Sequence, residues 1–122
     1  MKKILIVDDA VTVRMYHRQL MEALGFEVDE AENGIEALEK GLSQNYDLFL
    51  VDVNMPKMDG YRLIEEMRQS PELQVVPVIM ISTESSDEDR DKAYASGANF
   101  YVVKPAKVEE LQTFASLLAG EQ

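Results

Sequence analysis

The sequence predicts an α/β fold in which a parallel sheet is covered by helices on both faces. Three observations lead to this prediction. Short apolar runs alternate with segments of helical periodicity along the whole chain, and the connections between them are short. The apolar runs also end at polar or charged residues, as buried parallel strands do where they leave the core.

The N-terminal half begins with an apolar run that stops at two aspartates. That run is too short for a signal sequence and predicts a buried strand. A helix from Val11 to Leu24 should follow, ended by Gly25, and a turn at Asn33-Gly34 should precede the second helix. The three strands expected here are Lys3–Val7, Phe26–Glu30 and Asp47–Val51. The expected apolar stripes are Val13, Tyr16, Leu20 and Leu24 in the first helix and Ile35, Leu38 and Leu42 in the second.

The C-terminal half repeats the pattern. A third helix over Tyr61–Gln69 should end at Ser70-Pro71, because the residue before a proline disfavours helix. A fourth helix, Ser86–Ser96, has an acidic first turn that suits the positive end of the helix dipole, and Gly97 should cap it. The remaining strands are Val76–Ile81, with Pro77 near its start, and Asn99–Val103. The fifth helix should bury Val108, Leu111, Ala115 and Leu118.

Five strand–helix repeats with right-handed crossovers favour a flavodoxin-like (βα)5 doubly wound sheet of strand order 2-1-3-4-5. The 122 residues predict one domain, spanning 1–122. The chain contains no cysteine, which excludes disulfides and thiolate metal sites, and its net charge of −11 argues against a nucleic-acid partner. No apolar run approaches the roughly 18 residues of a membrane span, so we expect a cytoplasmic protein without membrane insertion.

The predicted topology gathers polar groups at the carboxyl edge of the sheet. The first strand ends at Asp8-Asp9, the third at Asp52, the fourth at Ser82 and the fifth at Lys104. Carboxylates from adjacent strand ends repel one another unless a cation joins them, and oxygen ligands without His or Cys select Mg²⁺, with Mn²⁺ possible.

This set of groups suits phosphoryl transfer. Asp52 would be the nucleophile, Lys104 would neutralise charge on the moving group, and the Ser82 hydroxyl would bind a phosphoryl oxygen. Taken one at a time, these residues have ordinary structural explanations: Asp8, Asp9 and Asp52 as helix caps or solvated turns, and Lys104 as a loop lysine.

Four motifs occur in a specific order: Val7-Asp8-Asp9, Asp52-Val53-Asn54-Met55-Pro56-Lys57-Met58-Asp59-Gly60, Ile81-Ser82 and Val103-Lys104-Pro105. They resemble the motifs of the receiver domain of two-component response regulators, above all the single-domain chemotaxis regulators. The resemblance covers essentially the whole chain and implies one receiver domain with no output domain.

The resemblance also implies a role for each motif residue. Asp52 is the phosphoacceptor, Ser82 the switch hydroxyl and Tyr101 the aromatic switch. Lys104 contacts the phosphoryl group and precedes a cis peptide bond to proline. The implied Mg²⁺ ligands are Asp9, Asp52 and the backbone carbonyl of Asn54, with Asp8 nearby. The positions that tune loss of the phosphoryl group are Asn54 and Glu84.

Several residues depart from the motifs or stand outside them. Thr83 is larger than usual after the switch serine and would either narrow access to Asp52 or offer a competing hydroxyl. Ala106 is smaller than usual after Lys-Pro and would loosen the corner before the last helix. His17, the single histidine, is interpreted as a packing or exposed residue rather than a catalytic one. Phe114 and Leu117 are interpreted either as packing or as part of an apolar patch for a partner.

The resemblance implies a phosphoacceptor that catalyses its own phosphotransfer and dephosphorylation, rather than an enzyme acting on outside substrates. A histidine kinase would donate the phosphoryl group, and the output would be protein binding, with the flagellar motor switch as the expected partner. A phosphate sink or stress-pathway relay receiver is the alternative within the family.

An aspartyl-nucleophile phosphatase is disfavoured because Asn54 stands where such enzymes carry a second aspartate. A flavin-binding module is disfavoured because Asp8-Asp9 would repel the flavin phosphate.

Overall fold

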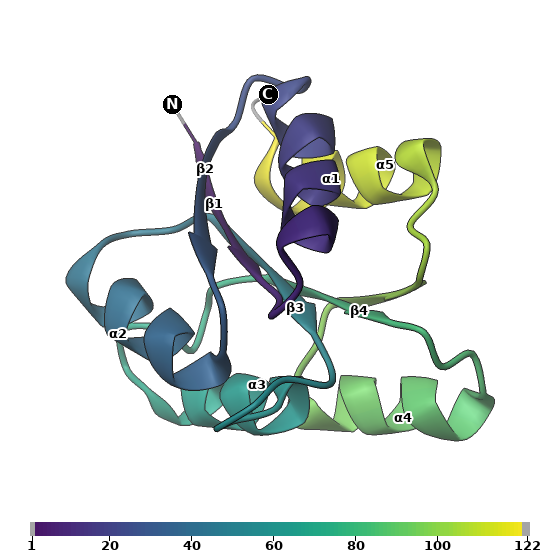
Figure 1. Cartoon of the computed structure of the whole chain (residues 1–122). Helices are drawn as coiled ribbons and strands as arrows, with labels where there is room; N and C mark the ends of the chain where they lie inside the picture. The colour runs from purple at the N-terminus through teal and green to yellow at the C-terminus, as the bar shows by residue number, and fades with distance from the viewer. Residues whose placement is uncertain (1, 121–122) are drawn as a thin grey trace.

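The computed structural model describes residues 2–120 and has a five-stranded parallel sheet of order β2-β1-β3-β4-β5 (Figure 1). This confirms the predicted fold class and strand order. The strands are β1 (Lys3–Val7), β2 (Glu27–Ala31), β3 (Leu48–Asp52), β4 (Val78–Ser82) and β5 (Phe100–Val103). The helices are α1 (Val11–Glu22), α2 (Gly34–Ser43), α3 (Gly60–Gln69), α4 (Asp87–Ser96) and α5 (Val108–Ala119).

The helices form two layers, with α1 and α5 on one face of the sheet and α2, α3 and α4 on the other (Figure 1). Alternate residues of β3 point to opposite faces, so Phe49 and Val51 join the core under α2, α3 and α4. Leu48 and Leu50 join the core under α1 and α5. Burial on both faces explains why the central strands are continuously apolar.

The predicted boundaries hold to within one or two residues. α1 ends at Glu22 rather than at Leu24, and β3 extends one residue further, so that Asp52 is its last residue. Gly97 caps α4 with φ of 115°, a left-handed conformation that favours glycine. Asn33, expected as a turn residue, caps α2 by accepting a hydrogen bond from the Glu36 backbone N–H.

The predicted apolar stripe of α2 is wrong at two positions. Ile35 and Leu42 are 43% and 56% exposed, whereas Gly34, Ala37 and Gly41 are buried, with Gly34 against Met58 of the loop after β3. A Cβ on Gly41 would come within 3.1 Å of the Phe49 side chain. α2 therefore packs so closely that small residues, which carry no hydrophobic signal, form its inner face.

The predicted stripes of α1 and α5 also need correction. In α1, Leu20 is buried as predicted, but Tyr16 and Leu24 are more than a third exposed. The buried face of α1 instead includes Arg14, His17 and Met21, because the helix is rotated relative to the apolar pattern. In α5, Leu111 and Ala115 are buried as predicted and Leu118 is partly buried, whereas Val108 is 44% exposed. Within residues 2–120, no helix combines the length and apolarity needed to cross a bilayer.

Candidate functional site

The strand register brings the polar strand ends together at one edge of the sheet. β1 pairs with β3 through Val7 and Val51, each one residue before an aspartate of the site. β4 pairs with β5 through Ser82 and Val103, so that Lys104 follows directly at the same edge. The candidate residues from four strand ends are therefore neighbours in space, as expected for a parallel sheet.

Three carboxylates form an acidic cluster. Asp8, Asp9 and Asp52 each offer an oxygen atom, and these atoms lie within 4.8 Å of one another. Asp8 is 2% and Asp52 is 8% exposed, whereas Asp9 is exposed. Oxygen ligands at this spacing fit a hard divalent cation, which agrees with the Mg²⁺ or Mn²⁺ chemistry expected from the residue types.

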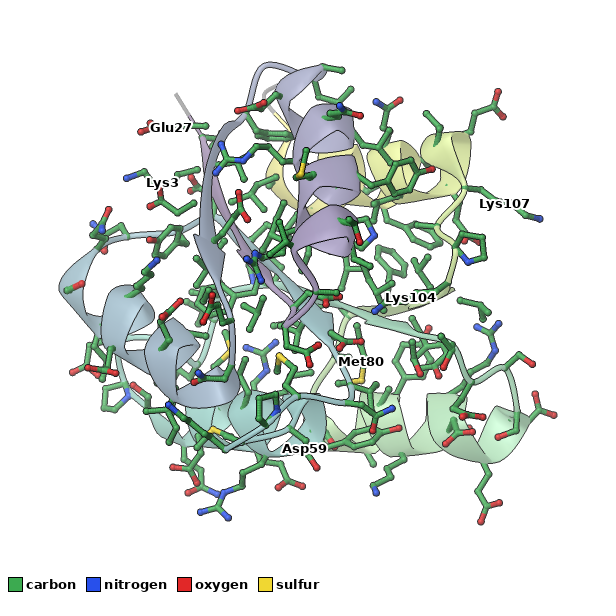
Figure 2. All side chains as sticks on the ribbon, in the orientation of Figure 1. Lys3, Glu27, Asp59, Met80, Lys104 and Lys107 are labelled. Atoms are coloured by element: carbon green, nitrogen blue, oxygen red, sulfur yellow. The ribbon has the colours of Figure 1, made fainter. Side chains whose placement is uncertain are left out.

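Lys104 joins two of these carboxylates. Its Nζ donates hydrogen bonds to Asp8 Oδ2 at 2.9 Å and to Asp52 Oδ1 at 2.8 Å. Lys107, three residues further along, extends outward from the start of α5 instead (Figure 2). The Lys104–Pro105 peptide bond is cis, as the sequence resemblance implied.

The cluster shifts the ionisation of its own members. Burial raises the pKa of Asp52, and the negative charges of Asp8 and Asp9 raise it further, against the opposing hydrogen bond from Lys104. Burial acts to lower the pKa of Lys104, but the hydrogen bonds to Asp52 and Asp8 outweigh it and raise that pKa. The Lys104 ammonium is therefore favoured in its charged form, whereas burial and the acidic neighbours disfavour ionisation of Asp52.

Arg14 supports the acidic loop from α1, a contact that sequence reasoning missed. Its Nη1 donates to the Asp8 backbone carbonyl at 2.6 Å, and its Nε donates to Glu30 Oε1 at 2.7 Å. The Asp8 side chain is also held locally, because its Oδ1 accepts a hydrogen bond from the Ala10 backbone N–H at 2.9 Å. An arginine on the buried face of a helix, paired with an acid on the neighbouring strand, gives no apolar signal in the sequence.

The loop after Asp52 depends on a glycine. A Cβ on Gly60 would lie 2.2 Å from the Asp52 carbonyl oxygen, so a side chain at this position would displace the backbone. The Gly60 N–H donates to the Val53 carbonyl at 2.8 Å, and Asp59 caps α3 by accepting from the Arg62 N–H. Asn54 is exposed within this loop, two residues beyond Asp52.

The loop after β4 is connected to both candidate switch residues. Ser82 is buried, and its Oγ accepts a hydrogen bond from the Glu84 N–H at 3.1 Å. Tyr101, 3% exposed on β5, donates from its hydroxyl to the Glu84 carbonyl at 2.7 Å. Thr83, between Ser82 and Glu84 in the sequence, is exposed. A movement of Ser82 would therefore act on the same loop residue that holds the Tyr101 hydroxyl.

The residues outside the motifs have clear positions. Ala106 is buried and its carbonyl accepts a hydrogen bond from the Tyr16 hydroxyl at 2.8 Å, so the corner before α5 is tied to α1 rather than loose. Phe114 packs against Phe100, with ring centroids 4.1 Å apart, whereas Leu117 is 68% exposed. Phe114 is thus a packing residue, whereas the Leu117 side chain is exposed on the surface of α5.

Comparison with known proteins gives a consistent result. A family model described as the response regulator receiver domain matches residues 4–116. The transcriptional regulatory protein ResD of Bacillus subtilis is 41% identical over 109 residues, which are 89% of this chain and 44% of that protein. Sensor protein EvgS of Escherichia coli is 36% identical over 115 residues, which are 94% of this chain and 9% of that protein. The chain spans less than half the length of these curated relatives.

Two solved structures are similar over nearly their whole length. The chemotaxis protein CheY4 of Vibrio cholerae has a TM-score of 0.90 and 33% identity, covering 97% of this chain and 98% of that one. The receiver domain of the sensor histidine kinase PA1611 from Pseudomonas aeruginosa has a TM-score of 0.90 and 30% identity, covering 98% of each chain. That structure holds a magnesium ion in its active site cleft.

Proposed function

Since this chain belongs to the response regulator receiver domain family of two-component systems, we propose that Asp52 accepts the phosphoryl group that carries the signal. One observation supports this assignment above the others. Asp52 is the carboxylate at the end of the central strand β3, and it shares the Lys104 ammonium group with Asp8. The two hydrogen bonds from Lys104 thus connect the proposed nucleophile, Asp52, with Asp8, a carboxylate of the proposed cation site. Lys104 itself would be the electrostatic partner of the phosphoryl group.

In the proposed reaction an ionised oxygen of Asp52 attacks the phosphorus atom of the donor. Lys104 stays in contact with Asp52 and neutralises charge on the transferred group, which is the main requirement of phosphoryl transfer. Mg²⁺, with Mn²⁺ as a substitute, would be held by Asp9, Asp52 and the Asn54 carbonyl with Asp8 nearby, and would neutralise further charge on the phosphoryl oxygens. Asn54 and Glu84 are both exposed around the site, where they would tune access of the hydrolytic water to the phosphoryl group.

The phosphoryl signal would leave through the β4–α4 loop. Phosphorylation adds charge and acceptor oxygens, and the Ser82 hydroxyl would turn from the Glu84 N–H to one of these oxygens. Tyr101, which is already buried, would then lose its present carbonyl partner in the same loop and occupy the space that Ser82 leaves. α4 can follow because only Ala93 and Ser96 of that helix are buried. The surface of α4, β5 and α5 would change through a population shift between two states.

A histidine kinase is the proposed donor, and protein binding in the cytoplasm is the proposed output. We favour a chemotaxis role at the flagellar motor switch, supported by the similarity to CheY4 along nearly the whole of both chains. A phosphate sink or relay receiver is the second candidate, because EvgS, a sensor protein, contains a similar segment. Recovery of the chain on an immobilised motor-switch peptide, dependent on phosphorylation, would favour the first role. Competition with another receiver for one kinase would favour the second.

Turnover of outside substrates is not part of the proposal. An aspartyl-nucleophile phosphatase would need an acid two residues beyond Asp52, and the amide of Asn54 cannot donate a proton as a carboxylic acid does. A phosphatase assay with an aryl phosphate tests this alternative directly. Steady release of the phenol by the wild type, but not by Asp52→Asn, would support the phosphatase alternative.

The proposed function is tested by weighing the intact chain after incubation with acetyl phosphate. We expect one added phosphoryl group in the presence of Mg²⁺, and none in its absence or in the Asp52→Asn variant. The matched control is Asp91→Asn, a change of the same chemistry on the surface of α4. If the Asp52→Asn variant still gains one phosphoryl group, the acceptor is another residue.

A further inference from the structure

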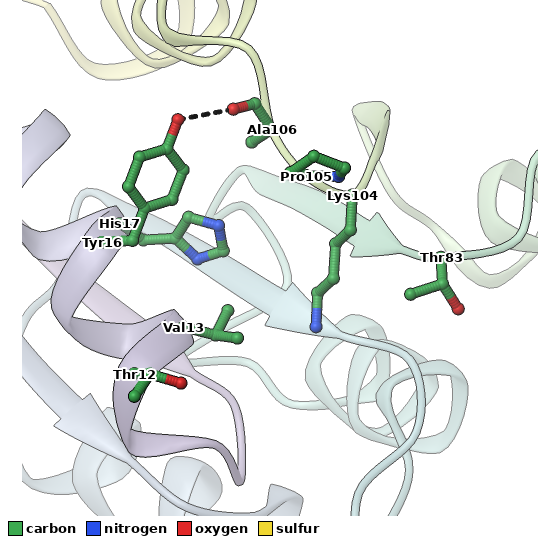
Figure 3. Close-up of a pocket in the computed structure, with 8 residues that line it drawn as sticks. All are labelled: Thr12, Val13, Tyr16, His17, Thr83, Lys104, Pro105 and Ala106. Atoms are coloured by element: carbon green, nitrogen blue, oxygen red, sulfur yellow. Dashed lines mark hydrogen bonds between the residues drawn. The ribbon is translucent and has the colours of Figure 1, made fainter.

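A pocket of about 290 Å³ lies beside the phosphoacceptor site, between α1 and the connection from β5 to α5 (Figure 3). Its walls are mainly apolar and come from Val13, Tyr16, Pro105 and Ala106. The small side chain of Ala106 leaves this space open, and the Tyr16 hydroxyl closes one side by donating to the Ala106 carbonyl.

The pocket adjoins the phosphoacceptor site through Lys104, which belongs to both. Lys104 and Thr83 line the pocket (Figure 3). The Nζ of Lys104 is also 2.8 Å from Asp52 Oδ1. A molecule in the pocket would therefore meet a positive charge at the end that faces Asp52 and apolar walls elsewhere. A volume of this size suits a small organic molecule.

His17 adds a polar group that the receiver chemistry does not use. His17 is 2% exposed and lines the pocket, and no side-chain hydrogen bond of its ring occurs within the described residues 2–120. Burial lowers the pKa of His17 to about 4, with a smaller lowering from Lys104 and an opposing effect of Asp8. The imidazole is thus neutral at pH 7 and offers one donor and one acceptor to whatever enters the pocket.

We propose that this pocket binds the acyl group of a small-molecule acyl phosphate, so that the chain selects phosphodonors with an apolar acyl group larger than acetyl. The inference rests on the proposed function, because the phosphoryl group of the donor is placed at Asp52 and Lys104. The apolar acyl chain lies between Pro105, Ala106 and Val13, and the His17 N–H donates to the acyl oxygen.

Phosphoryl transfer from the acyl phosphate to Asp52 needs no further reactant. A bond forms between an ionised Asp52 oxygen and phosphorus while the bond between phosphorus and the acyl oxygen breaks. The bonding electron pair leaves with the acyl oxygen, so the second product is a carboxylate anion and no proton is transferred. The hydrogen bond from His17 strengthens as charge develops on that oxygen, which favours the transition state.

The test compares acetyl, propionyl, butyryl and benzoyl phosphate as donors to the wild-type chain with Mg²⁺. The second-order rate constant of phosphorylation should rise by about fourfold for each methylene group buried. For benzoyl phosphate this rate constant should be about tenfold or more above that for acetyl phosphate. Rates that are equal along the series, or fall with size, would overturn the inference while leaving Asp52 as the acceptor. Failure of every donor, acetyl phosphate included, would instead count against the proposed function.

Two variants assign the selectivity to the pocket. Ala106→Leu fills the space, so the ratio of the benzoyl to the acetyl rate should fall to about one. His17→Phe keeps a ring but removes the donor, and should lower the rate with benzoyl phosphate by about tenfold. Leu117→Ala, on an exposed position of α5, is the matched control and should leave the ratio unchanged. A ratio that survives in Ala106→Leu would place the selectivity elsewhere.

A binding measurement on the wild-type chain keeps the test independent of variant folding. His17 is the single histidine, so its ring protons give unique NMR signals. Titration with benzoate, the leaving group of benzoyl phosphate, should shift these signals and slow phosphorylation competitively, and acetate should do neither at the same concentration. Unshifted ring signals at saturating benzoate would contradict the assignment.

Discussion

The charge on Asp52 should destabilise the folded chain, and removing it by Asp52→Asn should raise the free energy of unfolding at pH 7 in the absence of divalent cations. Asparagine keeps the shape of the side chain and an oxygen that accepts the hydrogen bond from Lys104. The substitution therefore isolates the charge from the packing.

The size of the effect follows from the distances in the acidic cluster. At the 4.8 Å limit that contains the carboxylate oxygens, Asp8 and Asp9 each repel Asp52 by about 3.5 kcal/mol at an effective dielectric constant of about 20. The Lys104 ammonium at 2.8 Å attracts it by about 6 kcal/mol on the same scale. The repulsions exceed the attraction by about 1 kcal/mol, and burial of the charge adds to this, so we expect a gain of roughly 1–2 kcal/mol.

The pH dependence has a definite sign. Because the pKa of Asp52 is raised in the folded chain, the wild type loses stability as the pH rises through that pKa, whereas Asp52→Asn has no such group to ionise. Urea unfolding should therefore show a stability difference that grows as the pH rises above about 4, the ordinary pKa of an aspartate. Adding Mg²⁺ at pH 7 should stabilise the wild type more than the variant.

The control is Asp91→Asn, which removes a carboxylate from the exposed surface of α4 and should change stability by less than about 0.5 kcal/mol. The electrostatic reasoning is refuted if Asp52→Asn is no more stable than the wild type at pH 7. A gain that is the same at every pH would also refute it, because the gain would then not come from ionisation of Asp52.

Three further changes test other parts of the site. Lys104→Met removes the ammonium group 2.8 Å from Asp52 and should slow phosphorylation by acetyl phosphate, followed by intact mass, by about a hundredfold or more; a rate near that of the wild type would exclude a role in transfer. Gly60→Ala forces a Cβ to within 2.2 Å of the Asp52 carbonyl and should cost about 2 kcal/mol or more in urea unfolding; an unchanged midpoint would contradict the close contact. Tyr101→Phe removes the 2.7 Å hydrogen bond to the Glu84 carbonyl and should speed amide exchange in the β4–α4 loop by about fivefold; equal exchange would show that the hydroxyl does not hold the loop.

The sheet and its polar edge could be predicted because both depend on patterns that are local in the sequence. Strands buried on both faces, such as β3, are continuous apolar runs, and parallel connections bring their ends to one edge. Asp8, Asp9, Asp52 and Lys104 each follow or end such a run, so their proximity in the structure was expected.

The inner faces of the helices could not be predicted in the same way. Gly41 faces the sheet because α2 lies so close that a larger side chain would clash, and a glycine gives no apolar signal. Arg14 is buried because Glu30, on the neighbouring strand, accepts its hydrogen bond, and a partner of this kind is visible only once β2 and α1 are placed together. His17 was expected to be a packing or exposed residue, and its position in the wall of a pocket depends on the same rotation of α1.

The most direct test of the central claim is to locate the phosphoryl group by chemistry. After incubation with acetyl phosphate and Mg²⁺, borohydride reduction converts an aspartyl phosphate into homoserine, which peptide mass spectrometry can place in the sequence. We predict homoserine at position 52 and at no other aspartate. Homoserine at position 8 or 9, with Asp52 recovered intact, would contradict the assignment of Asp52 as the phosphoacceptor.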